Sequence, residues 1–434
     1  MGKNTATIFI ILFGTISAIL FLDKPSKAQI LPSRTIEVQG ELIPPPWTIF
    51  SKLNEKDDEL ASVSLNVGSQ DITFYEDRIS RNSQGRTSTV QKKLQEPEKE
   101  IALKLLNKAT GEVSIIKITK HGAALISPPG YDVQIVKRAN GIRWNKWNTE
   151  YRVATPANLI VLKNKYPETT TKVTKIPGKD KKGRKITITK KQKVYEEFIY
   201  SPYSEALHTN EFVDKGQQDL KNIVNTAFDQ LRTASIKSRF APDKNIADIW
   251  TDSGNLKPQF IERLPLLEQS DTTEFFFEPI KTFERVEVIL AANDGLAYSK
   301  TCSKKSACGL FQFTDVWHGN KPGTYTSIAR AYPEAGLNPD FETGSKDQVN
   351  SAKAAILLYD YNIANLVKKY GQGILDDSLL EEYAGAAYNG SPKWVNKSLS
   401  ASISNALDDW TGHLKSETKG YMLKLRYLHE HNLP

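Results

Sequence analysis

The chain has 434 residues, of which 39% are hydrophobic and 25% charged, and its formal net charge is +8. This composition is ordinary for a globular protein and excludes a wholly disordered or collagen-like chain. Because a single hydrophobic core rarely grows beyond about 250–300 residues, the length favours two or more domains. The positive charge favours an anionic partner, such as nucleic acid, a membrane surface or a cell-wall polymer.

The first 28 residues have the features of an export signal. Lys3 precedes an uncharged run over 5–22, and the small residues Ser26 and Ala28 follow it. This pattern predicts a signal peptide over residues 1–28, cleaved after Ala28. An uncleaved membrane anchor is the alternative, because the run is just long enough to cross a bilayer. Both interpretations predict that the bulk of the chain is exported: a periplasmic or secreted bacterial protein if the signal is cleaved, and a membrane-anchored one if it is not.

Residues 29–210 are predicted to form a β-rich accessory domain. Short runs rich in β-branched and aromatic residues predict strands within 36–42, 61–67, 112–120 and 131–153. Asn140-Gly141 lies between two such runs and is typical of a type I′ hairpin turn.

A strongly basic segment lies at 163–193, with twelve Lys or Arg residues and two acidic ones. Its alternation of Thr, Val and Ile around Pro177-Gly178 predicts a long hairpin with an exposed basic tip, because so many lysines cannot be buried unpaired. Such a hairpin either keeps the protein soluble or docks on an anionic wall polymer or membrane surface. Nucleic acid is not an expected partner, because the chain is exported and no known readout motif accompanies the charge.

The periodicity becomes helical after residue 210. One helical face is predicted by the spacing of the apolar residues Leu220, Ile223, Val224, Ala227, Phe228 and Leu231. Further helices are predicted within 281–293, 345–371, 376–390 and 417–431, the second with a Ser345/Gln348 capping box. We therefore predict an α+β multidomain chain: the β-rich domain, a helical connector over 211–264, and an all-α domain over 265–434.

The two cysteines of the chain, Cys302 and Cys308, lie six positions apart. In an exported protein this spacing favours a disulfide over a redox pair. No cluster of His and Cys completes a metal site, so no metal is expected.

Asp294 is a candidate proton donor. It follows the apolar helix predicted over 281–293 and precedes Gly295. A carboxylate that emerges from a hydrophobic helix into a cleft is partly desolvated, which raises its pKa toward values useful for general acid catalysis. Taken alone, an Asp beside a Gly is more often a turn residue.

Three later segments give Asp294 its context. SACGLFQFT begins at Ser306, AGAAYNGSPKWV at Ala384 and ETKGY at Glu417. With Asp294, in this order, they make residues 265–434 resemble the lytic transglycosylase domain of the soluble lytic transglycosylase and goose-type lysozyme superfamily. That family has an apolar helix ending in a catalytic Glu-Ser, then Gly-Leu-Met-Gln, Ala-Tyr-Asn-x-Gly and Glu-Thr-x-x-Tyr steps. The resemblance implies a lysozyme-like helical fold.

The resemblance also implies an activity, the cleavage of peptidoglycan glycan strands without a cofactor. Asp294 falls on the general acid, which protonates the oxygen between N-acetylmuramic acid and N-acetylglucosamine and then serves as base toward the C6 hydroxyl, giving a 1,6-anhydro product. Phe311 and Gln312 would line the sugar groove. Tyr388 would hydrogen-bond near the acid, and Asn389 would hold the turn or the substrate. Glu417 and Tyr421 would belong to a closing helix.

The chain departs from the family at its acid, because Asp294-Gly295 stands in place of Glu-Ser. The donor oxygen of this shorter side chain has to come within about 2.6–3.2 Å of the glycosidic oxygen, so a small misplacement would lower the rate of cleavage. Two alternatives remain open. The protein binds peptidoglycan without cleaving it, or Asp315 positions a water for hydrolysis. Glu287, seven residues before Asp294, lies about 10 Å deeper along the helix.

Overall fold

The computed structural model describes residues 46–81, 87–138, 146–179, 185–299, 301–303, 306–317, 319–405 and 409–433, which belong to one compact unit, 45–434. The predicted signal peptide, the strand expected within 36–42 and the Asn140-Gly141 turn lie outside these residues. The described chain is a mixed α+β protein, in which strands lie before residue 201 and a series of helices follows residue 209.

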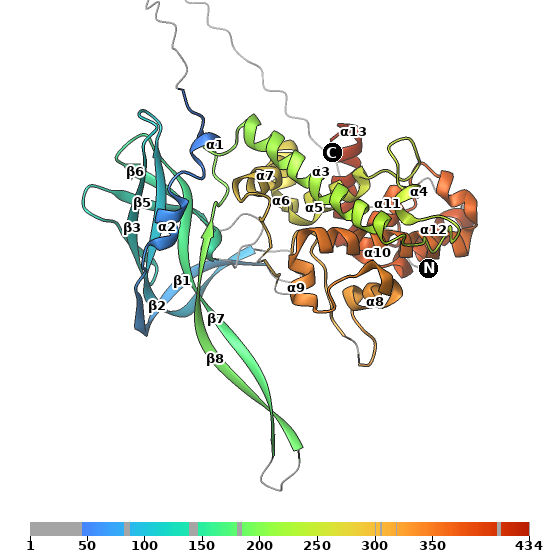
Figure 1. Cartoon of the computed structure of the whole chain (residues 1–434), viewed down its shortest axis with the longest axis horizontal. Helices are drawn as coiled ribbons and strands as arrows, with labels where there is room; N and C mark the ends of the chain where they lie inside the picture. The colour runs from blue at the N-terminus through green and yellow to red at the C-terminus, as the bar shows by residue number, and fades with distance from the viewer. Residues whose placement is uncertain are drawn as a thin grey trace, which may run out of the picture. The chain divides into compact units, whose positions relative to one another are not determined.

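Six strands form one antiparallel sheet in the order β4-β3-β2-β7-β8, with β1 paired to the first half of β2 (Figure 1). A second sheet pairs β5 with β6. The strands are β1 (Val67–Arg81), β2 (Thr87–Asn107), β3 (Val113–His121), β4 (Ala124–Ile126), β5 (Asp132–Arg138), β6 (Thr149–Thr155), β7 (Leu159–Lys179) and β8 (Lys185–Tyr200). The strands predicted within 112–120 and 131–153 are thus confirmed.

The strand predicted within 61–67 is wrong. Residues Asp57–Ser62 form the short helix α2, and the chain becomes a strand only at Val67. Three acidic residues occupy the first turn of α2, where they interact favourably with the helix dipole. Leu60 is fully buried and fixes the helix against the sheet.

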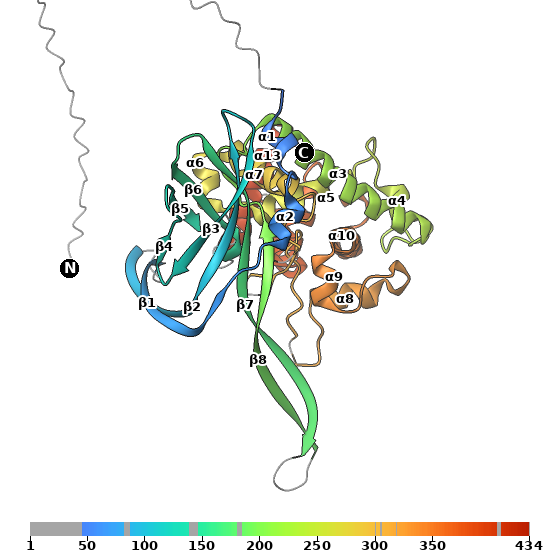
Figure 2. The ribbon, with the colours of Figure 1, turned by 60° about the vertical axis from the view of Figure 1, so that its left-hand side comes forward.

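The long basic hairpin is confirmed for the backbone of β7 and β8, which pair from Asn164 and Tyr200 out to Lys179 and Lys185. β2 pairs with β7 only as far as residue 165, so beyond it the two strands form a twisted ribbon of their own (Figure 2). Pro177 and Gly178 lie inside β7 and not at the turn. A ribbon with two free edges tolerates a proline. The side chains of 169–193 lie outside the described part.

Two lysines at the base of this hairpin are buried, contrary to the expectation that the basic segment is exposed. Lys163 Nζ donates to Asn54 Oδ1 at 2.7 Å and to Asp57 Oδ2 at 2.6 Å. Lys165 Nζ donates to two backbone carbonyls at the end of α2, at 2.7 Å each. Buried ammonium groups are tolerated when they are paired and hydrogen-bonded. The partners come from a segment about one hundred residues earlier in the chain.

The helical part follows β8. Its longer helices are α3 (Asn210–Thr233), α5 (Gln259–Gln269), α7 (Pro279–Ala292), α8 (Thr324–Ala331), α10 (Gln348–Tyr370), α11 (Leu380–Gly390), α12 (Pro392–Asn405) and α13 (Ser416–Glu430). All six apolar residues predicted to share a face of α3 are buried. α10 is the central helix, since it contacts α3, α5, α8, α11 and α12.

The capping box predicted at Ser345 is wrong. Ser345 lies inside the preceding short helix α9 (Phe341–Lys346). α10 is capped instead by Asp347, whose side chain accepts a hydrogen bond from the backbone N–H of Asn350.

One continuous hydrophobic core includes residues of both the sheet and the helices. Asn293 joins the two parts directly, because its side chain accepts from the backbone N–H of Ser201 at 2.9 Å and donates to the Ser201 carbonyl at 3.0 Å. The rings of Phe50 and Phe212 meet edge to face at 5.1 Å. Within the described residues, none of the helices has the length and apolar character needed to cross a bilayer.

Candidate functional site

Asp294 lies at the junction of the helical part with the sheet. It is exposed, follows the last turn of α7, and has a left-handed backbone with φ +52°. Its Oδ1 accepts a hydrogen bond from Asn54 Nδ2 at 3.2 Å. None of its contacts within the described chain involves Gln312, Tyr388 or Asn389.

The surroundings of Asp294 give it an electrostatic role. Lys104 is fully buried and pairs with Asp57. Burial lowers the pKa of Lys104, whereas the charges of Asp57 and Asp294 raise it. Asp294 is thus a second counter-charge for the buried Lys104.

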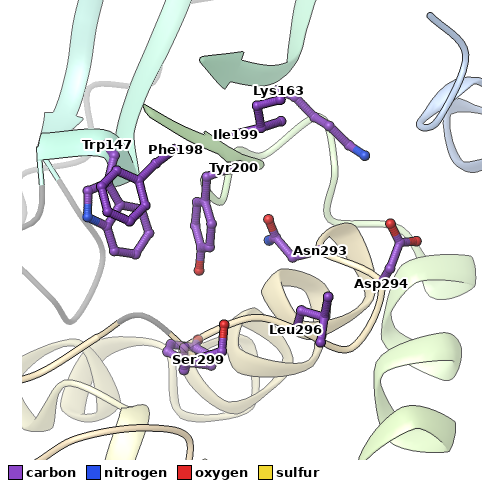
Figure 3. A pocket seen from close by; sticks show the side chains of 10 residues that line it. Trp147, Lys163, Phe198, Ile199, Tyr200, Asn293, Asp294, Leu296 and Ser299 are labelled. Carbon is purple, nitrogen blue, oxygen red and sulfur yellow. The ribbon is translucent and has the colours of Figure 1, made fainter. Parts of the chain in front are cut away.

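A pocket of about 260 Å³ adjoins Asp294 (Figure 3). Trp147, Phe198 and Tyr200 contribute its aromatic wall from the β-rich part. The loop after α7 forms the opposite wall.

The other segments of the resemblance meet elsewhere, around the turn at 309–312. Gln269, the last residue of α5, donates its amide to the carbonyls of Gly309 and Leu310 at 3.0 and 2.9 Å. Gly309 has φ +75°, and a Cβ there would lie 1.8 Å from the Ser345 carbonyl oxygen, so only glycine fits. Gln312 is partly exposed and donates to the Gly309 carbonyl at 2.8 Å.

Phe311 is fully buried, so its ring has no surface available to a ligand in this conformation. Its backbone carbonyl accepts a hydrogen bond from the Tyr388 hydroxyl at 2.7 Å. Tyr388 is partly exposed, and burial of its hydroxyl raises its pKa well above the ordinary value. Asn389, next in α11, is also partly exposed and accepts from Thr418 Oγ1 of α13 at 3.0 Å.

Glu268 is the carboxyl group at this second location. It is the penultimate residue of α5, directly before Gln269, and it retains partial exposure. Burial raises its pKa well above that of an ordinary glutamate and Glu417 adds to the rise, whereas Lys424 and the Tyr421 hydroxyl lower it. Among charged groups, Glu268 is also the strongest influence on the pKa of both Tyr388 and Tyr421, which it raises.

Two residues of α13 complete the surroundings of Glu268. Tyr421 is buried, and its hydroxyl has no hydrogen-bond partner of ordinary geometry among the described residues. Lys424 is buried and donates to the Leu267 carbonyl at 2.6 Å and to Ser270 Oγ at 2.9 Å. A cation at the C-terminal carbonyls of a helix satisfies them and complements the helix dipole. Lys424 therefore fixes the end of α5 that carries Glu268.

Sequence reasoning missed Glu268, although a signal was present. The segment Glu268-Gln269-Ser270 ends an apolar helix, and it is similar to the Glu-Ser that ends the catalytic helix of the family. The fifteen-residue interval between Asp294 and Gly309 favoured Asp294 instead. In the fold, Gln269 contacts Gly309, which lies 40 positions later in the chain, and the intervening segment includes α6 (Thr272–Phe277) and α7.

The other carboxyl candidates have structural contacts. Asp315 Oδ1 accepts from the Thr326 backbone N–H, and Oδ2 accepts from Thr326 Oγ1 and Trp317 Nε1, so both oxygens are occupied at the start of α8. Glu287 is buried inside α7 against Gln217. Glu417 is exposed in the first turn of α13.

The predicted disulfide between Cys302 and Cys308 is confirmed. Cys308 and Phe313 exchange two backbone hydrogen bonds, at 2.8 and 3.1 Å, that close the turn at 309–312. The disulfide thus holds the loop that enters this turn.

Replacing both Cys302 and Cys308 by Ser should lower the free energy of unfolding by about 2 to 3 kcal/mol, because a short closed loop is released in the unfolded chain. Denaturant unfolding measures this loss. Wild-type protein kept reduced serves as the matched control and should show the same loss. An unchanged free energy of unfolding in both samples would contradict a stabilising role.

Among the residues that the structure describes, no group of three or more His, Cys, Asp or Glu side chains is arranged to hold a metal ion. No protein-family model, curated protein or solved structure matches this chain. The function is therefore inferred from the residues themselves.

Proposed function

We propose that the chain cleaves the glycan strands of peptidoglycan between N-acetylmuramic acid and N-acetylglucosamine, with Glu268 as the proton donor. The observation that carries the proposal is the setting of Glu268. Its carboxyl group is desolvated enough to have a raised pKa, yet it remains partly exposed. A general acid needs both properties, because it must hold a proton near neutral pH and reach the substrate.

The proposed reaction uses one carboxyl group twice. Protonated Glu268 donates to the bridging glycosidic oxygen as the bond to C1 breaks. The resulting carboxylate then accepts the proton of the C6 hydroxyl, whose oxygen bonds to C1 and gives a 1,6-anhydro end. Neutral phenols at Tyr388 and Tyr421 add no negative charge that would oppose ionisation of the acid.

Two partly exposed amides near the 309–312 turn suit the N-acetyl groups of such a glycan. Gln312 uses its amide nitrogen for Gly309, and its Oε1 accepts no hydrogen bond from the described residues. Asn389 uses its oxygen for Thr418, and its Nδ2 has no acceptor within the described chain. One side chain thus offers an acceptor and the other a donor.

A second function is binding of peptidoglycan without cleavage. The position of Asp294 favours this second function. Asp294 is the residue that the resemblance aligns with the catalytic acid, yet it is exposed and does not belong to the cluster formed by Glu268, Tyr388, Tyr421 and Lys424. In that case the cluster would hold a glycan but not protonate it.

The test is digestion of purified peptidoglycan followed by mass analysis of the soluble fragments. We expect 1,6-anhydro muropeptides from the wild type and from Asp294→Asn, and none from Glu268→Gln. Fragments with reducing ends would indicate hydrolysis. Intact sacculi that retain bound protein would favour the second function. Release of muropeptides that is lost in Asp294→Asn but kept in Glu268→Gln would refute Glu268 as the acid.

A further inference from the structure

The pocket beside Asp294 is formed by segments that are far apart in the chain. Its wall from the β-rich part holds Trp147 and Phe198, whose rings stack at 5.5 Å, and Tyr200, which meets Trp147 edge to face at 4.6 Å. Leu296 and Ser299 line it from the loop after α7 (Figure 3). Its volume of about 260 Å³ is below the range of about 300–1,000 Å³ typical of drug-sized ligands, so it fits a group of roughly one ring.

Tyr200 brings an unsatisfied polar group to this pocket. The residue is only 7% exposed, and its hydroxyl interacts with the Tyr298 backbone but makes no hydrogen bond of ordinary geometry with the described residues. Figure 3 shows the hydroxyl directed toward the loop that carries Leu296 and Ser299. A buried hydroxyl without a partner costs about 1 to 3 kcal/mol, and folded proteins rarely keep one. A bound group that accepts its proton would remove this cost.

The loop opposite Tyr200 has an unusual backbone. Asp294, Gly295 and Tyr298 all have positive φ, at +52°, +73° and +66°. Such conformations are unfavourable for residues with a side chain and occur often at ligand sites. The two hydrogen bonds between Asn293 and the backbone of Ser201 fix the start of this loop.

The charges at the pocket favour a neutral ligand. One ammonium group, Lys163, and one carboxylate, Asp294, line the pocket, so the charges of its described lining balance. Asp294 Oδ1 accepts from Asn54, and Oδ2 accepts no hydrogen bond from the described residues. The site therefore offers an exposed carboxylate oxygen, which pairs with hydroxyl or amide donors.

We propose that this pocket binds one neutral sugar unit of a glycan. Its hydroxyl groups donate to Asp294 Oδ2 and accept from the Tyr200 hydroxyl, and its C–H face packs on the partly exposed Phe198 and the exposed Leu296. The choice of a glycan rests on the proposed function, but the pocket is separate from the cleavage site at Glu268. The β-rich part thereby holds a strand that the helical part cuts.

The test measures binding of the neutral tri-N-acetylglucosamine oligosaccharide to the full chain carrying Glu268→Gln, by isothermal titration calorimetry. Asp294→Asn replaces one carboxylate oxygen by an NH2 group and removes the charge, so it should weaken binding about 10-fold or more, since hydrogen bonds to charged groups contribute about 1.5 to 3 kcal/mol. Tyr200→Phe should weaken it by about 2- to 10-fold, as expected for a neutral hydrogen bond. Tyr195→Phe, on the exposed face of the same strand, is the matched control and should bind as the parent does.

Unfolding of the free variants separates a ligand role from a structural one. Tyr200→Phe removes an unpaired buried hydroxyl, so its melting temperature should equal or exceed that of the parent while its affinity falls. The proposal is overturned if the oligosaccharide does not bind. It is also overturned if Asp294→Asn and Tyr200→Phe leave the affinity unchanged while Gln312→Ala lowers it. Loss of affinity in the two pocket variants supports it even if the wild type cleaves no peptidoglycan.

Discussion

Glu268→Gln is expected to slow glycan cleavage by roughly 100- to 10,000-fold, the contribution typical of a positioned general acid. The amide keeps the size of the side chain but cannot donate a proton to the leaving oxygen. Steady-state cleavage of solubilised glycan strands measures the effect. Glu262→Gln is the matched control, because Glu262 lies on the same helix and its pKa is also raised by burial, and it should leave the rate near that of the wild type. Equal rates for wild type and Glu268→Gln would contradict the assignment.

The pH dependence of the wild type provides a second readout of the same residue. Cleavage should fall as the pH rises through the raised pKa of Glu268, because only the protonated form donates. Lys424 lowers that pKa by its positive charge. Lys424→Met should therefore move the alkaline limb of the rate profile to higher pH, in addition to any loss of rate from a loosened α5. Lys419→Met, an exposed lysine on the same helix, should leave the limb in place.

Local patterns predicted the elements whose formation depends on neighbours in sequence. The apolar face of α3 was predicted correctly because its six residues recur at the period of a helix. The β7–β8 pairing could be predicted because its residues alternate along neighbouring strands, and the disulfide because its two cysteines are close in the chain.

Predictions failed where distant segments supply the partners. Lys163 and Lys165 are buried because the segment of α1 (Ile49–Lys52) and α2 provides acceptors, which no local pattern indicates. The strand expected within 61–67 failed because the acidic first turn of α2 outweighs the β-branched residues after it. The chemistry of Glu268 depends on Tyr388, Tyr421 and Lys424, which lie at least 120 residues away and approach only through the packing of α5, α11 and α13.

Asp294 and Glu268 illustrate how burial changes the role of a carboxylate. Asp294 is exposed, its charge acts on the buried Lys104, and one of its carboxylate oxygens is left to accept hydrogen bonds from a ligand. Glu268 is desolvated, and this burial outweighs the opposing effects of Lys424 and the Tyr421 hydroxyl, so its setting favours the protonated form. The two residues are therefore suited to different parts of one task, in which Asp294 holds a sugar and Glu268 donates a proton.

A third carboxyl, Glu287, carries the largest expected effect on stability. It is 3% exposed within α7, where Gly216 of α3 packs directly on its backbone, and its one hydrogen bond comes from Gln217 Nε2 at 3.3 Å. Burial raises its pKa to about 8, and the charges of Glu284 and Asp214 act in the same direction. The folded protein thus holds a proton that the unfolded chain releases near its ordinary pKa of 4.5.

Unfolding therefore releases a proton between about pH 4.5 and 8, so raising the pH across this window destabilises the wild type by about 1.4 kcal/mol per pH unit. Glu287→Gln should remove this dependence, because the amide is neutral at every pH and still accepts from Gln217. The variant should match the wild type near pH 4 and exceed it by about 3 kcal/mol at pH 7, as measured by urea unfolding across the pH series. Glu211→Gln, an exposed residue at the start of α3, should show no such divergence. A difference between Glu287→Gln and wild type that stays constant with pH would show that Glu287 titrates near its ordinary pKa in the folded protein.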